Sequence, residues 1–517
     1  MATTEQVETD FADADRGFVG TDDAPITGAD GRVVFHPGAY DFLAAEPPAQ
    51  VHPGLWRQSR LNAEHGLYEV TAGIYQVRGF DISTMTLIEG ATGVIVVDPL
   101  TAAETAAAAL ALYRRHRGDR PVTAVIYTHP HADHFGGVLG VVQPGTRVPI
   151  VAPEHFLEHA VSENVYAGVA TLRRGYYYGG DPLPLAADGK VGIGLGVCPA
   201  HGSIGLLAPT VEISATGEAA TYDGVEFVFQ MTPGTEAPAE MNFHLPGHRA
   251  LCMAENTAHN LLTLRGAQVR DPRIRSRYIA EATELFGGES DVLFASHHWP
   301  TWGRARIAEY LRAQRDLYAY LHDQSVRLMN QGCTGAEIAE RITLPESLAA
   351  NQHVRGYYGS VSHNVKAVFQ RYLGWYDGNP AQLRQHPPVE RARNGVTAPA
   401  LSSAGMAGAL TVTQLFDTVA IRLVPERAGD QRLSIHWVLT DLAEHYRMEL
   451  GNAVLVHFPT RRDDAADLTV ELTHPQLLAA LTTGDLGAVR CTGDPGVLRR
   501  ILAMTDAPDP RFAVVTP

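Results

Sequence analysis

Residues 128–137 read Thr-His-Pro-His-Ala-Asp-His-Phe-Gly-Gly, and this run is the most informative feature of the chain. It follows an apolar, β-branched stretch that indicates a strand. Because side chains alternate along a strand, His129 and His131 leave its end on one face, and Asp133 and His134 follow around the next turn. Three imidazoles and a carboxylate suit a borderline cation such as zinc. A histidine-rich loop without metal is the alternative, and the strand–loop–glycine context counts against it.

The His-x-His-x-Asp-His pattern resembles the signature of the metallo-β-lactamase fold, an αβ/βα sandwich of two packed sheets with a metal centre at one edge. The resemblance implies one ion on His129 and His131 and a second on Asp133 and His134. Asp98 ends an earlier apolar strand, where a carboxylate behind the ligands would orient the histidine rings. The alternative for Asp98 is a turn residue at a strand end.

Composition bounds the class of protein. A chain of 517 residues is too long for one ordinary core, so two or three domains are expected. A net charge of −16 without a dense Lys/Arg run argues against nucleic acid or an anionic membrane surface as partner. Four scattered cysteines argue against a disulfide scaffold or a thiolate metal site. We see neither a secretory signal nor an integral membrane segment, and therefore expect a cytoplasmic protein, with a periplasmic or secreted location as the alternative.

Composition and hydrophobic periodicity change along the chain, and these changes predict five segments. The polar segment 1–60 indicates an extended arm or partial disorder. Alternating strands and helices over 61–303 predict an α/β catalytic domain, and apolar residues at helical spacing predict a helical domain over 304–390. Residues 391–408 indicate a linker of small residues, and 409–517 a separate α+β domain with antiparallel strands and helices.

Several elements can be placed more closely. We expect strands at 67–71, 74–78, 85–90, 433–439, 446–450, 453–458 and 468–472, and helices at 102–116, 307–323, 335–341, 362–373, 410–423 and 475–483. The helical domain is rich in aromatic residues, which indicate either a protein interface or ordinary helix packing: Tyr357, Tyr358, Tyr372, Trp375 and Tyr376.

Four short segments downstream carry a more specific resemblance. They read Thr-Glu-Ala-Pro-Ala-Glu from 235, Ala-Glu-Asn from 254, Thr-Leu-Arg-Gly from 263 and His-His-Trp-Pro from 297. Together with the three-part organisation they resemble the alkyl sulfatase family, over nearly the whole chain from about Leu67. That family joins a zinc-dependent lactamase-like domain, a helical dimerisation domain and a C-terminal domain similar to sterol carrier protein type 2. The resemblance implies two zinc ions per chain, a homodimer through the helical domain, and hydrolysis of an amphiphilic alkyl sulfate ester by a metal-activated water.

The resemblance also implies the remaining metal ligands. Glu236 would bind the first zinc, Glu255 would bridge both ions and His297 would complete the second. Glu240 is the alternative to Glu236, unless it is a solvated turn carboxylate. His298 is the alternative to His297, since adjacent strand residues point to opposite faces and only one can face the metals. The other histidine would then pack or hydrogen-bond behind the ligand.

Three further residues are candidates for handling the sulfate group. Arg265 can present paired donors to an oxyanion, and its alternative is a surface ion pair. His259 lies four residues after Glu255, so a helical segment would place both on one face and make His259 a general acid. This stretch is shorter and poorer in histidine than the family pattern, which leaves the identity of the acid open. Tyr178 could contact sulfate or only pack its loop.

Two other functions fit parts of the pattern. A thioesterase or lactonase on the same fold would need neither the glutamates nor the C-terminal domain. A lipid-binding protein with a vestigial site would not need the intact His-x-His-x-Asp-His run. Cleavage at carbon or at sulfur, and a primary or secondary alkyl chain, stay open.

Overall fold

The computed structural model describes residues 4–167, 183–266, 268–376, 411–461, 464–484, 486–487 and 489–506. It divides into two compact units. The first comprises Met1–Gln268, Leu285–Leu311 and Gln352–Ser360, and the second Val269–Glu284, Arg312–Asn351 and Val361–Pro517. The linker expected at 391–408 lies outside the described residues, and the domain boundaries expected from sequence stay predictions.

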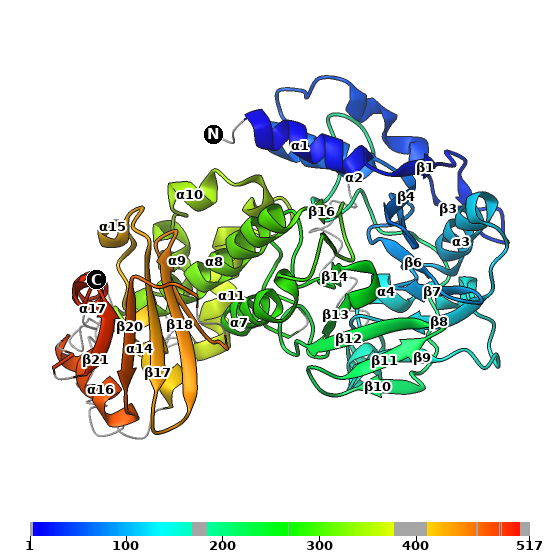
Figure 1. The fold of residues 1–517 in the computed structure, drawn as a ribbon. Coiled ribbons are helices and arrows are strands. Elements are labelled where there is room, and N and C mark those ends of the chain that lie inside the picture. Colours follow the sequence, from blue (N-terminus) through cyan, green and yellow to red (C-terminus); the bar gives the residue numbers. More distant parts are fainter. Residues whose placement is uncertain are drawn as a thin grey trace. The chain divides into compact units, whose positions relative to one another are not determined.

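The first unit contains two large β-sheets (Figure 1). The first sheet has the order β1-β4-β5-β6-β7-β8-β9-β10, with strands at Phe18–Gly20, Gly66–Thr71, Ile74–Arg78, Met85–Glu89, Val94–Val97, Val122–Ile126, Ile150–Pro153 and Val211–Ile213. The second runs in sequence order from β11 to β16, at Ala219–Tyr222, Val225–Met231, Met241–Leu245, Ala250–Cys252, Val292–Phe294 and Thr301–Trp302.

Strand β7 shows how the layers pack. Ile95 and Val97 belong to the apolar cluster that joins the two sheets, in which they meet the phenylalanines of β12 and β13. Val94 and Val96 belong to the cluster on the opposite face, which helix α3 (Ala103–Arg117) covers. A strand buried on both faces needs a continuous apolar run, because its side chains alternate between two cores. The expected αβ/βα layering is therefore present around the first sheet.

Parallel pairing brings four strand ends to one region of the first unit. β7 pairs in parallel with β8, so Asp98 and Thr128 follow neighbouring strand ends. The turn after β8 leads into the short helix α4 (Ala132–Phe135), which carries the next part of the histidine motif. In the second sheet β14 pairs in parallel with β15, so Glu255 and His297 also follow neighbouring strand ends. Ligands at the carboxyl ends of parallel strands are a general property of α/β folds.

The N-terminal segment is more structured than we expected. It forms helices α1 (Thr4–Asp15), η1 (Pro37–Ala44) and α2 (Pro53–Ala63), and the hairpin β2–β3 (Ile26–Thr27 and Val33–Phe35). Strand β1 adds to the first sheet by pairing antiparallel with β4. Trp56 and Tyr40 are buried in a small apolar cluster of their own, so the alternative of disorder is wrong for this segment. Sparse apolar residues therefore suffice here, since a larger body is available to pack against.

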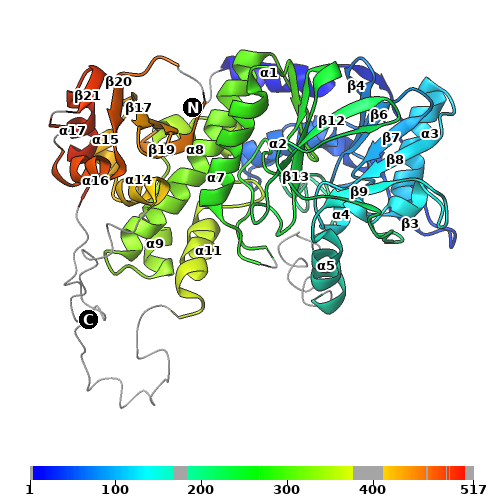
Figure 2. The same cartoon turned by 60° about the horizontal axis from the view of Figure 1, so that its bottom comes forward.

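The second unit contains a five-stranded sheet in the order β19-β18-β17-β20-β21, at Val454–Pro459, Glu444–Gly451, Leu433–Leu439, Leu468–Leu472 and Arg490–Gly493. Helices α14 (Val412–Ala420), α16 (His474–Thr483) and α17 (Gly496–Ala503) share one apolar cluster with this sheet (Figure 2). The expected α+β organisation is confirmed, but β17 and β20 pair in parallel, not antiparallel as we expected. The similarity of this domain to sterol carrier protein stays a prediction.

Helices form the remainder of the second unit, together with the start of α8 in the first. They are α7 (Pro272–Ala282), α8 (Arg304–Met329), α9 (Gly335–Arg341), α10 (Glu346–Ala349), α11 (Val361–Leu373) and α15 (Pro425–Ala428). A capping box begins α9: the side chain of Thr334 accepts from the backbone N–H of Glu337, and the side chain of Glu337 accepts from the backbone N–H of Thr334. Throughout the described part of the chain, no helix combines the length and apolarity that a membrane crossing requires.

Candidate metal centre

Three buried imidazoles converge on one carboxylate oxygen in the first unit. The Nε2 atoms of His129, His134 and His297 lie 3.1, 3.3 and 3.5 Å from Oε2 of Glu255. The side chains of these histidines are inaccessible to solvent, and none of the three Nε2 atoms has a hydrogen-bond partner among the described residues. Burying a polar nitrogen without a partner is unfavourable, so this arrangement needs a ligand shared by several lone pairs.

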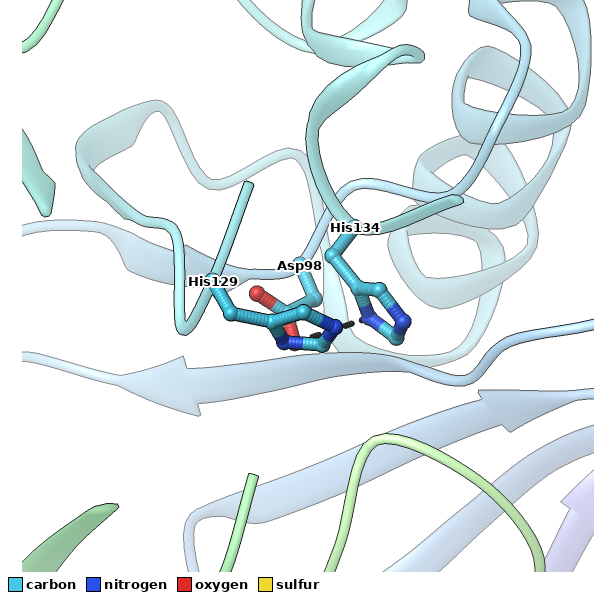
Figure 3. Close-up of side chains that lie close together, drawn as sticks. All are labelled: Asp98, His129 and His134. Carbon is cyan, nitrogen blue, oxygen red and sulfur yellow. Dashed lines mark hydrogen bonds and ion pairs between the residues drawn. The ribbon is translucent and has the colours of Figure 1, made fainter. Parts of the chain in front are cut away.

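The other ring nitrogen of each histidine is held by the protein. Nδ1 of His134 donates to Asp98 (3.1 Å), as Figure 3 shows beside the ring of His129. Nδ1 of His129 lies 2.9 Å from the Thr128 hydroxyl, which itself donates to Asp98, and therefore accepts from the ring. Nδ1 of His297 donates to the Ile82 carbonyl (3.0 Å). In its neutral form each ring thus keeps its proton on Nδ1 and directs the Nε2 lone pair into the centre.

His131 approaches the centre with its opposite nitrogen. Its Nδ1 lies 3.9 Å from Oε2 of Glu255, and its Nε2 lies 3.6 Å from a carboxylate oxygen of Glu163. Glu163 belongs to the π-helical turn η3 (Ser162–Tyr166), which continues helix α5 (Phe156–Val161). This glutamate was not anticipated from the sequence, because nothing in its local pattern links it to a motif more than thirty positions earlier.

Asp133 and Glu255 supply negative charge on two sides of the centre. Oδ2 of Asp133 lies 3.1 Å from Nε2 of His134 and 3.5 Å from Nε2 of His297. Potential ligand atoms within 4.8 Å of one another form three groups, which are His129–His131–Glu255, Asp133–His134–His297 and Asp98–His129–His134. The first two groups share the Glu255 oxygen as a common neighbour, which is the arrangement expected of a bridging carboxylate.

Burial and charge shift the pKa values in this centre. Burial, and after it the neighbouring His134, lower the pKa of His129 to about 3. Burial would raise the pKa of Asp98, but the hydrogen bond and positive charge of His134 hold it below its ordinary value. Burial likewise opposes the ionisation of Glu255, and the surrounding histidines nevertheless keep its pKa well below the usual range. Burial opposes a positive charge on His134, but Asp133, Asp98 and Glu255 raise its pKa well above the ordinary value, so a bound cation would take the place of a proton on this ring.

The two glutamates of the 236–240 loop have different surroundings. Oε2 of Glu240 accepts from the Thr235 hydroxyl (2.7 Å) and from the backbone of Glu236 (3.1 Å). Its Oε1 accepts from the backbone N–H of Glu255 (3.2 Å), so Glu240 links this loop to Glu255. Glu240 is fully buried, and the alternative of a solvated turn carboxylate is wrong. Glu236 is also buried but belongs to none of the ligand groups found among the described residues, and its metal role stays a prediction.

The second histidine of the His-His pair packs behind the first, as expected. Nδ1 of His298 accepts from the backbone N–H of His259 (3.1 Å), and its Nε2 donates to the Gly194 carbonyl (3.0 Å). His298 is buried and has a positive φ of 67°, which turns the chain sharply after His297.

His259 does not lie where the sequence suggested. The segment after β14 is irregular rather than helical, so Glu255 and His259 share no helix face. The ring is buried and stacks on Trp299 with centroids 4.5 Å apart, and its Nε2 donates to the Trp299 carbonyl (2.9 Å). Burial holds the pKa of His259 well below its ordinary value, so the ring is neutral. His259 belongs to none of the ligand groups found among the described residues, and its role as general acid stays a prediction.

The remaining predicted residues concern the sulfate group. Arg265 is half-buried, and its backbone N–H donates to the Thr263 hydroxyl (3.3 Å). Its role as an oxyanion clamp stays a prediction. Tyr178 lies outside the described residues.

A buried loop aspartate that the sequence did not reveal supports the second ligand group. Asp81 accepts hydrogen bonds from the backbone of Ile82, Thr101 and Ala200. It thereby fixes the turn whose Ile82 carbonyl orients His297. The signal for this role is only a polar residue between two apolar strands, which is too common to single out.

This donor set fits a metal cation. Three buried imidazole nitrogens lack hydrogen-bond partners, and two ionised carboxylates lie beside them. These groups would attract a cation, which would satisfy the nitrogen lone pairs. The fold agrees with this reading, since residues 78–208 match the model of the metallo-β-lactamase superfamily. The fold and these candidate ligands together support a metal cofactor, and which residues hold it stays a prediction.

The regions downstream match two further family models. Residues 334–413 match the alkyl sulfatase dimerisation model, and residues 400–517 match the alkyl sulfatase C-terminal model. A linear primary-alkylsulfatase from Pseudomonas sp. is 38% identical over 99% of this chain and 90% of its own length. The chain belongs to the alkyl sulfatase family.

Other relatives of this alkyl sulfatase agree. The alkyl/aryl-sulfatase BDS1 of Saccharomyces cerevisiae is 50% identical over 75% of the chain, and the match spans 61% of the yeast protein. The solved structure of the stereoselective inverting sec-alkylsulfatase Pisa1 from Pseudomonas sp. superposes with a TM-score of 0.71 at 35% identity, covering 99% of this chain and 98% of that one. The expected fold class and the resemblance stated from the sequence are confirmed.

Proposed function

We propose that this alkyl sulfatase uses two zinc ions to hydrolyse alkyl sulfate esters to an alcohol and inorganic sulfate. The observation that supports two ions is the position of the Glu255 oxygen between two separate ligand groups. One group would hold the first ion and the other the second, with these ligands: His129, His131 and Glu255, then Asp133, His134 and His297.

When bound, zinc would lower the pKa of a coordinated water to about 7 and polarise the ester. The chain's own part is to hold the ligands in place. Asp98 fixes the ring of His134, and Glu240 fixes the backbone of Glu255, so neither ligand has to reorganise during the reaction. Burial of this centre lowers the local dielectric and strengthens its electrostatic interactions.

A local positive centre is needed for an anionic substrate, because the chain as a whole carries a charge of −16. We propose that Glu236 completes the first zinc site and that Arg265 binds the sulfate group. A guanidinium presents two parallel donors to an oxyanion, which a point charge such as lysine cannot do. The position of Arg265 in the same irregular segment as Glu255 supports this role.

We also propose that the protein is a homodimer assembled through its helical region. The match of residues 334–413 to a dimerisation model supports this. Multi-angle light scattering after size-exclusion chromatography should give about twice the mass of the 55.9 kDa chain. A monomer at micromolar concentration would contradict the assembly.

A substrate panel tests the reaction. Sulfate release is measured with dodecyl sulfate and with a chiral secondary alkyl sulfate, beside a thioester and a lactone of similar chain length. We expect turnover of the sulfate esters only, lost on chelation and restored by zinc, with about two zinc ions per chain by elemental analysis. Preferred turnover of the thioester or lactone would favour another hydrolase on the same fold, and no turnover at full metal content would favour a binding protein.

The configuration of the secondary alcohol separates the two cleavage routes. Attack at carbon inverts the stereocentre, whereas attack at sulfur retains it. Labelled water gives a second, independent readout, since the label enters the alcohol in the first route and the sulfate in the second.

A further inference from the structure

A second histidine group lies behind the metal centre in the first unit. The ring of His259 stacks on Trp299 (4.5 Å between centroids, planes 2° apart) and meets the ring of His353 edge-on (4.4 Å, 72°). The backbone N–H of His259 donates to His298, the residue directly after the predicted ligand His297. His259 therefore contacts, by ring and by backbone, the turn that carries His297.

The charge behind this group comes from the N-terminal helix α1. Asp10 is 1% exposed, and its Oδ1 accepts from Nε2 of His353 at 2.9 Å. Its Oδ2 accepts from Arg57 of α2 at 2.6 Å. A carboxylate held by two charge-assisted bonds has little freedom, so the ring of His353 has a defined orientation. The contacts thus run from Asp10 through His353 and His259 to the turn at His298.

We propose that Asp10 is a positioning residue of the metal centre. Through His353 it fixes the ring of His259, and through that ring the turn that presents His297 to the second ion. The inference rests on the proposed binding of zinc at this centre. It gives the N-terminal helix a part in the active site that its distance in sequence from every ligand does not suggest.

Asp13 of the same helix is a matched control. It is 5% exposed and forms an ion pair with Arg306, but it does not contact the histidine group in any of the described interactions. Asp10→Asn and Asp13→Asn each replace one buried negative charge of α1 by a neutral amide and thereby weaken one ion pair with an arginine. Only the first change weakens the link to His353.

The test measures zinc affinity, kcat and KM for the wild type and both variants. Zinc affinity is obtained by competition with a chromogenic chelator, and kcat and KM by sulfate release from dodecyl sulfate. For Asp10→Asn we expect about tenfold weaker binding of one of the two ions, the lower end of the effect of losing a group that orients a ligand. We expect kcat to fall with it at limiting zinc, with KM unchanged, and saturating zinc to restore most of kcat. Asp13→Asn should match the wild type in all three quantities.

Two results would overturn the proposal. One is wild-type zinc affinity in folded Asp10→Asn, and the other is an equal loss in Asp13→Asn. If Asp10→Asn does not fold, His353→Gln replaces it, since the amide keeps a donor for Asp10 but removes the ring that packs on His259. Unchanged zinc affinity in His353→Gln would equally refute the proposal. Weaker zinc binding in a protein that hydrolyses no sulfate ester would leave the positioning role intact and remove only the proposed reaction.

Discussion

Replacing Asp98 by asparagine tests how the protein orients its metal ligands. Oδ2 of Asp98 accepts from His134 (3.1 Å), from the Thr128 hydroxyl (2.7 Å) and from the Ser296 hydroxyl (2.7 Å), and Oδ1 accepts from the Thr128 backbone (2.8 Å). Asp98 has φ +50°, a conformation that asparagine tolerates and most other residues do not. The substitution therefore changes charge and hydrogen bonding while keeping the backbone.

The expected magnitudes follow from these four bonds. Because three donors point at the Oδ2 position, the amide oxygen of the new asparagine should occupy that position. The amide NH2 group then occupies the Oδ1 position and faces the backbone N–H of Thr128. One buried donor pair is left unsatisfied, which costs about 1–3 kcal/mol of unfolding free energy. A neutral acceptor also makes His134 a weaker ligand, and losing such a partner typically weakens metal binding about 10–100-fold, equivalent to about 1.4–2.8 kcal/mol.

Asp223 offers a control at the opposite ends of the same two strands. It also has a positive φ (46°) and accepts hydrogen bonds from Thr92, Gly93 and Thr123, beside the starts of β7 and β8. Chelator competition measures zinc affinity, and urea unfolding of the metal-free proteins measures stability. The only change expected in Asp223→Asn is a lower free energy of unfolding, and its zinc affinity should equal that of the wild type. Wild-type zinc affinity in Asp98→Asn, or an equal loss in both variants, would refute the reasoning.

Three further predictions concern the bridge, the metal and the second unit. Glu255→Gln should reduce bound zinc from about two ions to about one and abolish sulfate release, and near-normal turnover would remove the bridging assignment. Chelation should lower the unfolding free energy by about 2.7 kcal/mol for each zinc ion, or about 5.4 kcal/mol for two, relative to the protein in zinc at 100 times its Kd. This loss is seen as a lower Tm, and an unchanged Tm would contradict metal binding to the folded state. Burial opposes ionisation of Asp417, but His457, Arg277 and Arg273 lower its pKa to about 2 from the ordinary 3.8. The ionised form of Asp417 therefore stabilises the fold above pH 3.8 and loses that effect as the pH falls towards 2. In urea unfolding, Asp417→Asn should lower the free energy of unfolding by about 2 kcal/mol at pH 7 and by about 1 kcal/mol at pH 3. A loss that does not depend on pH would contradict this.

Much of the fold follows from local pattern. Continuous apolar runs predicted β7 and β8, because a strand buried on both faces is apolar at every position. Alternating apolar residues predicted β17 and β20, because burial of one face repeats every second residue. The parallel pairing of β17 with β20 was missed, since strand direction depends on how a long connection crosses the sheet. The order in the N-terminal segment was missed for a related reason, because its few apolar residues are buried against one another and against partners distant in sequence such as Ala102 and Val191.

The sequence by itself determined which residues form the metal-binding motif, because His129, His131, Asp133 and His134 lie within six positions and need only one strand and one turn to converge. Only the tertiary structure decided what surrounds them. The end of a parallel strand places Glu255 beside these histidines, Glu240 accepts a hydrogen bond from the backbone of Glu255, and the ring of His259 stacks on Trp299. These roles depend on which atoms meet across long separations in the chain, and no local spacing encodes that.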